Sequence, residues 1–421
     1  MTLKKEQLKK LYLDNKLICN CIILAVLFFI NCFWGEFAYI SFATLALMVG
    51  FADTKEGFSL LVACVPFFCI KMSISMILFC ACLMIFLVKA HIRMYVKDKV
   101  KPNKVILVIF ALFLVYCLIP FGPYGVDYLI KFVATFCILG IINVFSVYPG
   151  DMRLRFNLVL LSMGLLVATV YCLTYFVSPY LQDNLVILGE HDFIRFAALF
   201  DNPLNLSRIC EICLSMQMYF ILSKHHKLTW VDPVSMVIYL MLGISTISKA
   251  SLILFAIMGV ILVCYAFKQS PFKTLLFITF AAIIVLIVVL AFNEFIMTYA
   301  GRFVGEDFAS LDINEKLNVI TTDRWDLWTD YVRYLSEHPV VLLFGAGFGA
   351  GKISVMSAHN FYLTVLYQFG IVGGALFVTT FVVFIRKFLK NYPGKISKAI
   401  WVPLAILLLI MCVEDFFLFI Y

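Results

Sequence analysis

Apolar runs long enough to cross a membrane repeat along almost the whole chain, with short polar stretches between them. A membrane-spanning helix needs about 17 or more mainly apolar residues, so the runs predict an all-α polytopic membrane protein with about 12 to 13 transmembrane helices. Two runs, 37–52 and 58–70, are short and could be tilted, paired or re-entrant, which leaves the parity of the first four helices open. The predicted spans are residues 17–34, 37–52, 58–70, 72–88, 105–121, 127–147, 156–177, 204–222, 232–247, 250–266, 274–296, 360–385 and 399–419.

Two polar stretches interrupt this pattern, residues 178–203 and the much longer 298–358. Lipid cannot solvate the charged groups that they carry, so both stretches must face water or protein. The chain is therefore predicted to form a single multi-pass membrane domain, residues 1–421, with a loop at 178–203 and a helical cap at 298–358.

Composition supports the membrane prediction and excludes one class of function. Hydrophobic residues make up 64% of the chain and charged residues 14%, whereas a soluble domain has about half and about a quarter. The first apolar run leads into further spans without a small-residue cleavage site, so no signal peptide is expected. The loops between spans are too short for a nucleotide-binding domain and contain no phosphate loop, so we do not expect a reaction driven by ATP bound to this chain.

The net charge of +8 follows the predicted topology. Of the 33 lysines and arginines, 23 lie in short loops or at helix ends away from the two polar stretches, most of them in 1–16, 89–104 and 386–398. Short basic loops remain in the cytoplasm during insertion. The N-terminus is therefore predicted to be cytoplasmic and both polar stretches extracytoplasmic. Both stretches are acidic on balance, so the basic excess does not indicate a nucleic-acid partner.

All fourteen cysteines lie in or beside apolar runs. Cys210 and Cys213 have the spacing of a redox or zinc pair, but they fall in a predicted membrane helix, where cysteine usually behaves as a small hydrophobic residue. We therefore expect neither a disulfide framework nor a metal site.

Residues 323–337 are predicted to form an amphipathic helix in the cap, with Thr322 or Asp323 as its N-cap. Arg324 falls on the apolar arc, where a cation costs free energy unless an anion meets it. The alternative is that Arg324 belongs to a frayed first turn and reaches water. The apolar arc consists of Trp325, Trp328, Tyr331, Val332 and Leu335, and the polar arc of Asp326, Asp330, Arg333 and Glu337.

Two further cations are predicted at the same face of the membrane. Arg195 offers a planar fork of donors suited to phosphate or carboxylate, but it could instead pair with one of the neighbouring carboxylates of its loop. Lys249 follows Ser248 at the start of a span. It could anchor to lipid headgroups or serve as a third cation over one site.

His359 and Asn360 stand where the cap returns to the membrane. A histidine titrates near neutrality and can accept a proton from a hydroxyl, although a lone histidine at a membrane boundary is more often structural. The glycines of 345–351 permit a close backbone approach. No βαβ unit surrounds them, so they do not indicate a dinucleotide site. His191 and His338 also lie in the polar stretches, and we rank them below His359.

Several motifs along residues 185–385, in this order, resemble the O-antigen polymerase and O-antigen ligase family (Wzy/WaaL-like). Two departures affect the first motifs: Lys249 replaces the usual arginine, and Ala197 and Leu204 replace a glycine and an asparagine. The motifs are Arg195-Phe-Ala-Ala-Leu199 followed by Asn202-Pro203, Ser248-Lys249, Thr322-Asp323-Arg324-x-x-x-Trp328, Glu337-His338-Pro339, the glycine run, Ala358-His359-Asn360-x-Tyr362-Leu363 and Gly370-Ile371-Val372-Gly373.

The resemblance implies a GT-C-like glycosyltransferase that moves oligosaccharide from a polyprenyl-diphosphate carrier, such as undecaprenyl diphosphate, to an acceptor sugar at the outer face of the cytoplasmic membrane. It implies no cofactor, nucleotide sugar or metal. Arg195, Arg324 and His359 would be catalytic, with the arginines stabilising the departing diphosphate. Lys249 and Asn360 would bind diphosphate or glycan beside them. His359 could activate the acceptor hydroxyl or bind the diphosphate.

Three functions remain open at this stage. The first is a polymerase of O-antigen or capsule type, which would work with a flippase and a chain-length regulator in building the cell envelope. The second is a ligase that transfers finished glycan to a lipid or protein. The third belongs to another class, a flippase or transporter of lipid-linked glycan, although we find no internal repeat of the kind that transporters often show.

Overall fold

The computed structural model describes residues 15–67, 72–101, 104–118, 126–149, 153–184, 196–200, 202–223, 229–272, 275, 279, 311–321, 324–347, 353, 358–392 and 398–413. Every regular element within these residues is helical, and the protein is an all-α polytopic membrane protein. Lipid offers no hydrogen bonds to a backbone, and helices satisfy their own amides and carbonyls within one segment.

Each helix of the membrane bundle overlaps one of the spans predicted from sequence. Short 3₁₀ segments follow two of the helices, at Val65–Phe67 and Leu173–Phe176, and a π-helical segment, Arg93–Lys97, follows a third. The first helices are α2 (Lys16–Asn31), α3 (Phe37–Phe51), α4 (Thr54–Cys64), α5 (Met72–Ile92), α6 (Lys104–Leu118), α7 (Val126–Val147) and α8 (Leu154–Cys172). The later ones are α10 (Pro203–Leu222), α11 (Val231–Ser245), α12 (Lys249–Gln269), α18 (Phe361–Asn391) and α19 (Trp401–Val413).

Among the described residues, four apolar helices are each long enough to cross a membrane, and six further apolar helices have 10–17 residues. The long ones are Ile74–Lys97, Leu154–Phe176, Lys249–Gln269 and Phe361–Asn391. The short α3 and α4 occupy the two runs that were short in sequence. The span predicted at 274–296 lies almost wholly outside the described residues, so the number of 12 to 13 helices stays a prediction.

Hydrogen bonds between helix ends define two opposite ends of the bundle. Lys89 near the end of α5 donates to the Gly50 carbonyl at the end of α3 (2.8 Å), and Asn391 at the end of α18 donates to the Ser146 carbonyl at the end of α7 (2.5 Å). These helix ends adjoin the basic stretches of the sequence, and we call this the basic end.

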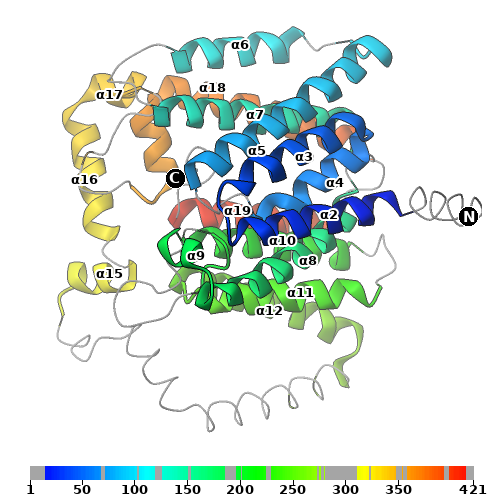
Figure 1. Cartoon of the computed structure of the whole chain (residues 1–421). Helices are drawn as coiled ribbons and strands as arrows, with labels where there is room; N and C mark the ends of the chain where they lie inside the picture. Colours follow the sequence, from blue (N-terminus) through cyan, green and yellow to red (C-terminus); the bar gives the residue numbers. More distant parts are fainter. Residues whose placement is uncertain are drawn as a thin grey trace, which may run out of the picture.

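The other end of the bundle carries the cap. The Ser178 hydroxyl donates to the Cys32 carbonyl after α2 (2.6 Å), and the Asn360 amide donates to the Cys412 carbonyl near the end of α19 (2.8 Å). The helices α15 (Ile313–Thr321), α16 (Arg324–Glu337) and α17 (Pro339–Phe344) lie along this end, where α16 runs across the direction of the bundle helices (Figure 1). We call it the cap end.

Large apolar side chains face outward along the bundle, as they must in lipid. Leu47 is 62% exposed and Val260 62% exposed, although both lie well inside apolar helices. Tryptophans mark both ends, since Trp34 follows α2 at the cap end and Trp230 precedes α11 at the other. Interfacial tryptophans of this kind anchor a membrane protein at the headgroup level.

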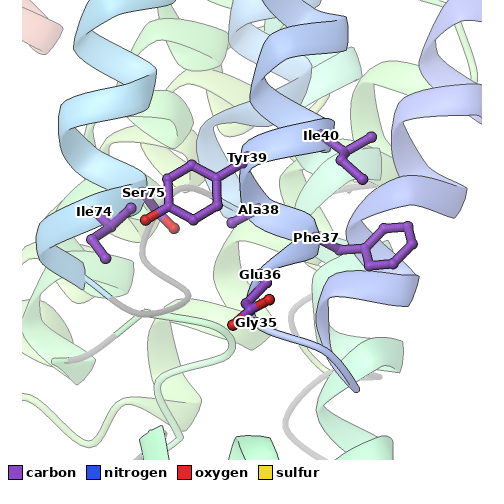
Figure 2. Close-up of a pocket in the computed structure, with 8 residues that line it drawn as sticks. All are labelled: Gly35, Glu36, Phe37, Ala38, Tyr39, Ile40, Ile74 and Ser75. Atoms are coloured by element: carbon purple, nitrogen blue, oxygen red, sulfur yellow. The ribbon is translucent and has the colours of Figure 1, made fainter.

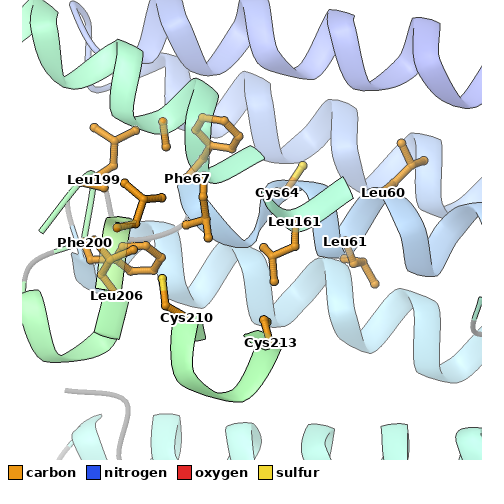
Figure 3. Close-up of a cluster of buried hydrophobic side chains, with 14 of the residues drawn as sticks. Leu60, Leu61, Cys64, Phe67, Leu161, Leu199, Phe200, Leu206, Cys210 and Cys213 are labelled. Atoms are coloured by element: carbon orange, nitrogen blue, oxygen red, sulfur yellow. The ribbon is translucent and has the colours of Figure 1, made fainter. Parts of the chain in front are cut away.

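The core joins helices that are far apart in sequence. Figure 3 shows Leu60 and Cys64 of α4, Leu161 of α8, and Cys210 of α10 directed into one apolar cluster. Cys210 and Cys213 are buried there as free thiols, in keeping with their interpretation as small hydrophobic residues.

The long helix α18 is broken at Gly370 (φ 60°, ψ −171°), a conformation open essentially to glycine alone. The break frees carbonyls that would otherwise bond within the helix. The Tyr367 carbonyl accepts from the Ala346 amide (2.7 Å), and the Phe369 carbonyl accepts from the Tyr116 hydroxyl of α6 (2.7 Å). Gly345 crosses this point so closely that a Cβ on either glycine would overlap the other segment.

Candidate active site at the cap end

The start of α16 is fixed by side chains of the preceding helix α15. The Thr321 hydroxyl accepts the Trp325 amide (3.0 Å), and the Asn318 side-chain oxygen accepts the Asp326 amide (3.0 Å). These are the amides that an N-cap would satisfy. The predicted caps Thr322 and Asp323 lie outside the described residues, and their role stays a prediction.

The amphipathic character predicted for this helix is confirmed in large part. Tyr331 and Leu335 are buried, whereas Asp326 and Arg333 are exposed. The placement of Val332 on the buried face was wrong, because this side chain is 56% exposed. The buried arc is therefore narrower than predicted, with Tyr331 and Leu335 as its fully buried members.

Tyrosines form the contact between α16 and α18. The Tyr331 and Tyr367 rings meet edge to face with centroids 5.5 Å apart, and Tyr334 lies 6.0 Å from Tyr367. Ala358 completes this buried cluster. Aromatic pairs at these distances contribute about 0.5–1.5 kcal/mol beyond their buried area, so the cap is attached to the membrane helix by specific packing.

The two arginines of α16 differ in burial. Arg324, the first residue of the helix, is half-buried. Arg333 is exposed, with a side-chain exposure of 65%, and lies 3.6 Å from the Asp330 carboxylate. The face of α16 that carries Arg324 is therefore more buried than the face that carries Arg333.

Lys249 joins the bundle to the cap. It is the first residue of α12, and the Ser248 side chain before it accepts the Ser251 amide as N-cap. The Lys249 ammonium donates to the Val319 carbonyl of α15 (2.8 Å). The interpretation of Lys249 as only a headgroup anchor is therefore too simple, since the side chain points to the helix that positions Arg324.

His359 is held from both sides. The Trp328 indole of α16 donates to the carbonyl of the preceding Ala358 (2.8 Å), and the following Asn360 is the N-cap of α18. His359 itself has a left-handed backbone (φ 45°) and is half-buried. Arg324 and Trp328 are four residues apart, so they share one face of α16. Arg324 is thereby placed about one helical turn from the residue that fixes the chain beside His359.

The Asn360 side chain makes structural hydrogen bonds. Its oxygen accepts the amides of Tyr362 (3.1 Å) and Leu363 (3.2 Å), and its nitrogen donates to the Cys412 carbonyl (2.8 Å). These contacts fix the first turn of α18 against α19. A role of Asn360 in binding substrate stays a prediction.

A cavity of about 390 Å³ also opens at the cap end, between the start of α3 and the start of α5. Figure 2 shows Tyr39 pointing from α3 toward Ile74 and Ser75 of α5, with Glu36 at the turn before α3. None of the residues predicted for the site lines this cavity. Within the described part of the chain, no group of three His, Cys, Asp or Glu side chains could hold a metal ion.

Comparison with known families adds the decisive observation. Residues 234–378 match the model of the O-antigen ligase family. This stretch of the chain is similar to the O-antigen ligase family, which supports the resemblance to the O-antigen polymerase and ligase family. No curated protein and no solved structure matches it. Members of this family are glycan-transferring enzymes.

The O-antigen ligase domain contains four of the five predicted site residues. It begins in α11, includes Lys249, the cap helices with Arg324, and His359 and Asn360, and ends in α18 beyond the break at Gly370. Hydrogen bonds join Lys249 to α15, α15 to the first turn of α16 that carries Arg324, and Trp328 of α16 to the residue before His359.

Arg195 lies outside both the O-antigen ligase domain and the described residues. The described residues that follow it, 196–200, are largely buried in the protein. Ala197, Leu199 and Phe200 are almost fully buried, and Figure 3 shows Leu199 and Phe200 in the core. The Phe196 amide donates to the Ser245 carbonyl at the end of α11 (3.1 Å), four residues before Lys249.

Sequence reasoning missed the residues that position the site within the O-antigen ligase domain. Trp328 and Tyr331 were read only as parts of an apolar arc, and Tyr367 and Tyr116 not at all. Amphipathic spacing shows that a side chain is buried but not which carbonyl it meets. Only the glycines of 345–351 indicated such a contact in the sequence, because they predicted a close approach of the backbone to another segment.

Proposed function

We propose that this protein is a glycan polymerase that joins oligosaccharide repeat units carried on polyprenyl diphosphate at the cap end of the bundle. The observation that carries the proposal is the match of residues 234–378 to the O-antigen ligase family. It is supported by hydrogen bonds that join Lys249 to α15, α15 to the start of α16, and α16 to the chain just before His359. The similarity to this family supports a lipid-linked glycan substrate in the membrane.

The charge at the cap end suits such a substrate. A diphosphate at the membrane surface is a concentrated anion, and Arg324 and Lys249 are cations at the junction of cap and bundle. Arg195 would add a second guanidinium. Preorganised donors aimed at a leaving group that gains charge typically contribute about a hundredfold to a thousandfold in rate each.

The reaction forms one glycosidic bond and breaks one bond to phosphate. The acceptor hydroxyl oxygen attacks the anomeric carbon of the donor glycan, and the bond between that carbon and the diphosphate oxygen breaks. The electron pair leaves with the polyprenyl diphosphate, whose charge the cations stabilise. The hydroxyl proton passes to His359 or to the departing diphosphate, and in the second case His359 binds the diphosphate.

We further propose that the basic end is cytoplasmic and the cap end extracytoplasmic, in the cytoplasmic membrane. Most lysines and arginines outside the two polar stretches lie near the basic end, as the retention of short basic loops in the cytoplasm requires. The transfer would then take place where lipid-linked units arrive after crossing the membrane, next to the flippase and chain-length regulator that such a polymerase needs.

A ligase is the second candidate, since the matching family is described as O-antigen ligase. It would use the same cations and the same leaving group but a different acceptor, so the site does not separate the two. The difference lies in whether a second lipid-linked unit can act as acceptor.

The test incubates the purified full-length protein, in lipid nanodiscs, with polyprenyl-diphosphate repeat units alone. A ladder of longer lipid-linked glycans supports the polymerase. Transfer only after a separate lipid or protein acceptor is added establishes the ligase instead. If vesicles containing the protein move the units across the bilayer without forming any bond, the protein is a flippase and the proposal fails.

A further inference from the structure

A cavity of about 370 Å³ lies far from the cap, between α5, α6, α7 and α18 near the basic end. This volume lies within the range of about 300–1,000 Å³ that is typical of small-molecule sites. Its walls are mostly apolar, with Met84, Phe110 and Phe136 among them, and Lys387 of α18 lines it as well.

Polarity in this cavity changes along the bundle axis. His91, Asn143 and Lys387 each lie within about one turn of the basic end of their helix. Met84 and Phe136 lie about two to three turns deeper. A polar mouth at the interface and an apolar interior toward the midplane match the two parts of a membrane lipid.

The polar groups at the mouth are arranged for an additional ligand. The Asn143 amide nitrogen lies 3.2 Å from His91 Nε2 and donates to the Tyr95 hydroxyl (3.3 Å). His91 Nδ1 lies 2.8 Å from the Leu87 carbonyl. The Tyr95 hydroxyl oxygen thus accepts from Asn143, and no hydrogen bond from its proton is found among the described residues.

The Lys387 ammonium takes no part in these hydrogen bonds. It is half-buried, and no carboxylate among the residues that the structure describes lies within ion-pair distance of it. A cation in apolar surroundings is costly unless an anion meets it. Its neighbour Lys390 on the same helix is exposed to the surroundings.

A basic cleft on the other side of α5 supports the choice of an anion. It has a volume of about 1,050 Å³ and shares Met84 and Val88 with the apolar cavity. Five basic side chains line this cleft against two carboxylates, Asp53 and Asp98. Clusters of lysine and arginine at this depth attract anionic headgroups.

We propose that this cavity binds an anionic phospholipid of the leaflet at the basic end, with an acyl chain between α5, α6, α7 and α18 and its phosphate on Lys387. The lipid would complete the packing of α18 near its C-terminal end. The N-terminal end of the same helix, capped by Asn360, lies at the cap end. The site is independent of the proposed glycan transfer, because it lies at the opposite end of the bundle.

Native mass spectrometry of delipidated full-length protein, titrated with phosphatidylglycerol or phosphatidylcholine, tests the proposal. We expect phosphatidylglycerol to bind at least about tenfold more tightly than phosphatidylcholine, and Lys387→Gln to remove that preference. Lys390→Gln is the matched control, because it removes the same charge from an exposed position of the same helix, and it should keep the preference.

Two further arms keep the proposal falsifiable. Lys387→Arg should restore the preference, and Lys387→Gln protein should elute from size exclusion like the unmodified protein. Inorganic phosphate at equal concentration should not displace phosphatidylglycerol. Equal binding by Lys387→Gln and Lys390→Gln proteins, or displacement by free phosphate, would overturn the lipid site.

Discussion

The Trp328 indole donates a 2.8 Å hydrogen bond to the Ala358 carbonyl, and this contact joins the cap helix to the chain immediately before His359. Ala358 is fully buried. The bond therefore fixes the entry of the chain into α18 without occupying the side chain of His359. It connects the two parts of the site that the sequence places 35 residues apart, Arg324 and His359.

Replacing Trp328 by Phe tests this connection. A smaller aromatic ring takes the place of the indole, and the buried Ala358 carbonyl loses its donor, which costs about 1–3 kcal/mol. We expect a lower thermal unfolding midpoint and slower glycan transfer. The control is Trp325→Phe, since the Trp325 indole donates to the exposed side chain of Asn314 at 3.3 Å. Equal effects of the two substitutions would contradict the positioning role of Trp328.

The left-handed backbone at His359 allows chemistry and conformation to be separated. Asparagine and histidine are both enriched at positive φ, so His359→Asn should keep the fold while removing the imidazole. We expect transfer to fall by about a hundredfold or more, with an unchanged unfolding midpoint. A fall in kcat alone indicates a proton acceptor, and a rise in KM for the lipid donor indicates a diphosphate ligand.

His338 is the matched control for that substitution. It is exposed and stacks on Tyr334, with ring centroids 4.1 Å apart. Transfer by His338→Asn protein should stay within about twofold of the unmodified rate, because surface substitutions away from special features have small effects. Equal losses for the two histidines would show that neither position is special.

The crossing of Gly345 and Gly370 should be intolerant of any side chain. Gly370→Ala places a Cβ against the backbone of residues 343–345 in a region open almost only to glycine. We expect little folded protein after detergent extraction, measured by fluorescence-detected size exclusion. Gly259→Ala, in the interior of α12 with nothing near its Cβ, should be neutral or slightly stabilising.

Lys249 is predicted to act through α15 as well as by its charge. Lys249→Gln removes the cation while a shorter polar side chain remains, and we expect transfer to drop by about tenfold or more, because a charged hydrogen bond contributes about 1.5–3 kcal/mol. Lys268→Gln at the opposite, exposed end of α12 should have no effect on transfer. Wild-type activity of the Lys249→Gln protein would remove this residue from the site.

The positions of the membrane helices followed from the sequence because lipid imposes one rule on every span. Runs of apolar residues gave the starts of α2, α3 and α18 to within a residue. The amphipathic cap helix was also predicted, since the charges on one side of α16 leave a single face for packing. Val332 shows the limit of that reasoning, because periodicity does not tell how wide the covered face is.

The sequence predicts which residues belong to the candidate site, but not the contacts that position them. Hydropathy and motif order indicate that Lys249, Arg324 and His359 belong to one face of the membrane. The contacts that join them, Lys249 to Val319 and Trp328 to Ala358, depend on how distant segments pack. Neither local propensity nor spacing carries that information. For the same reason, the sequence did not predict that the segment after Arg195 is buried.

Comparison of Arg324→Ala with Arg333→Ala tests the central claim most directly. Both changes remove a guanidinium from the same helix, but only Arg324 is half-buried beside the site. The measurement is the rate of polyprenyl diphosphate release from lipid-linked repeat units by each purified protein. We predict a loss of about a hundredfold or more for Arg324→Ala and less than about twofold for Arg333→Ala. Equal release rates for the two proteins would contradict the account.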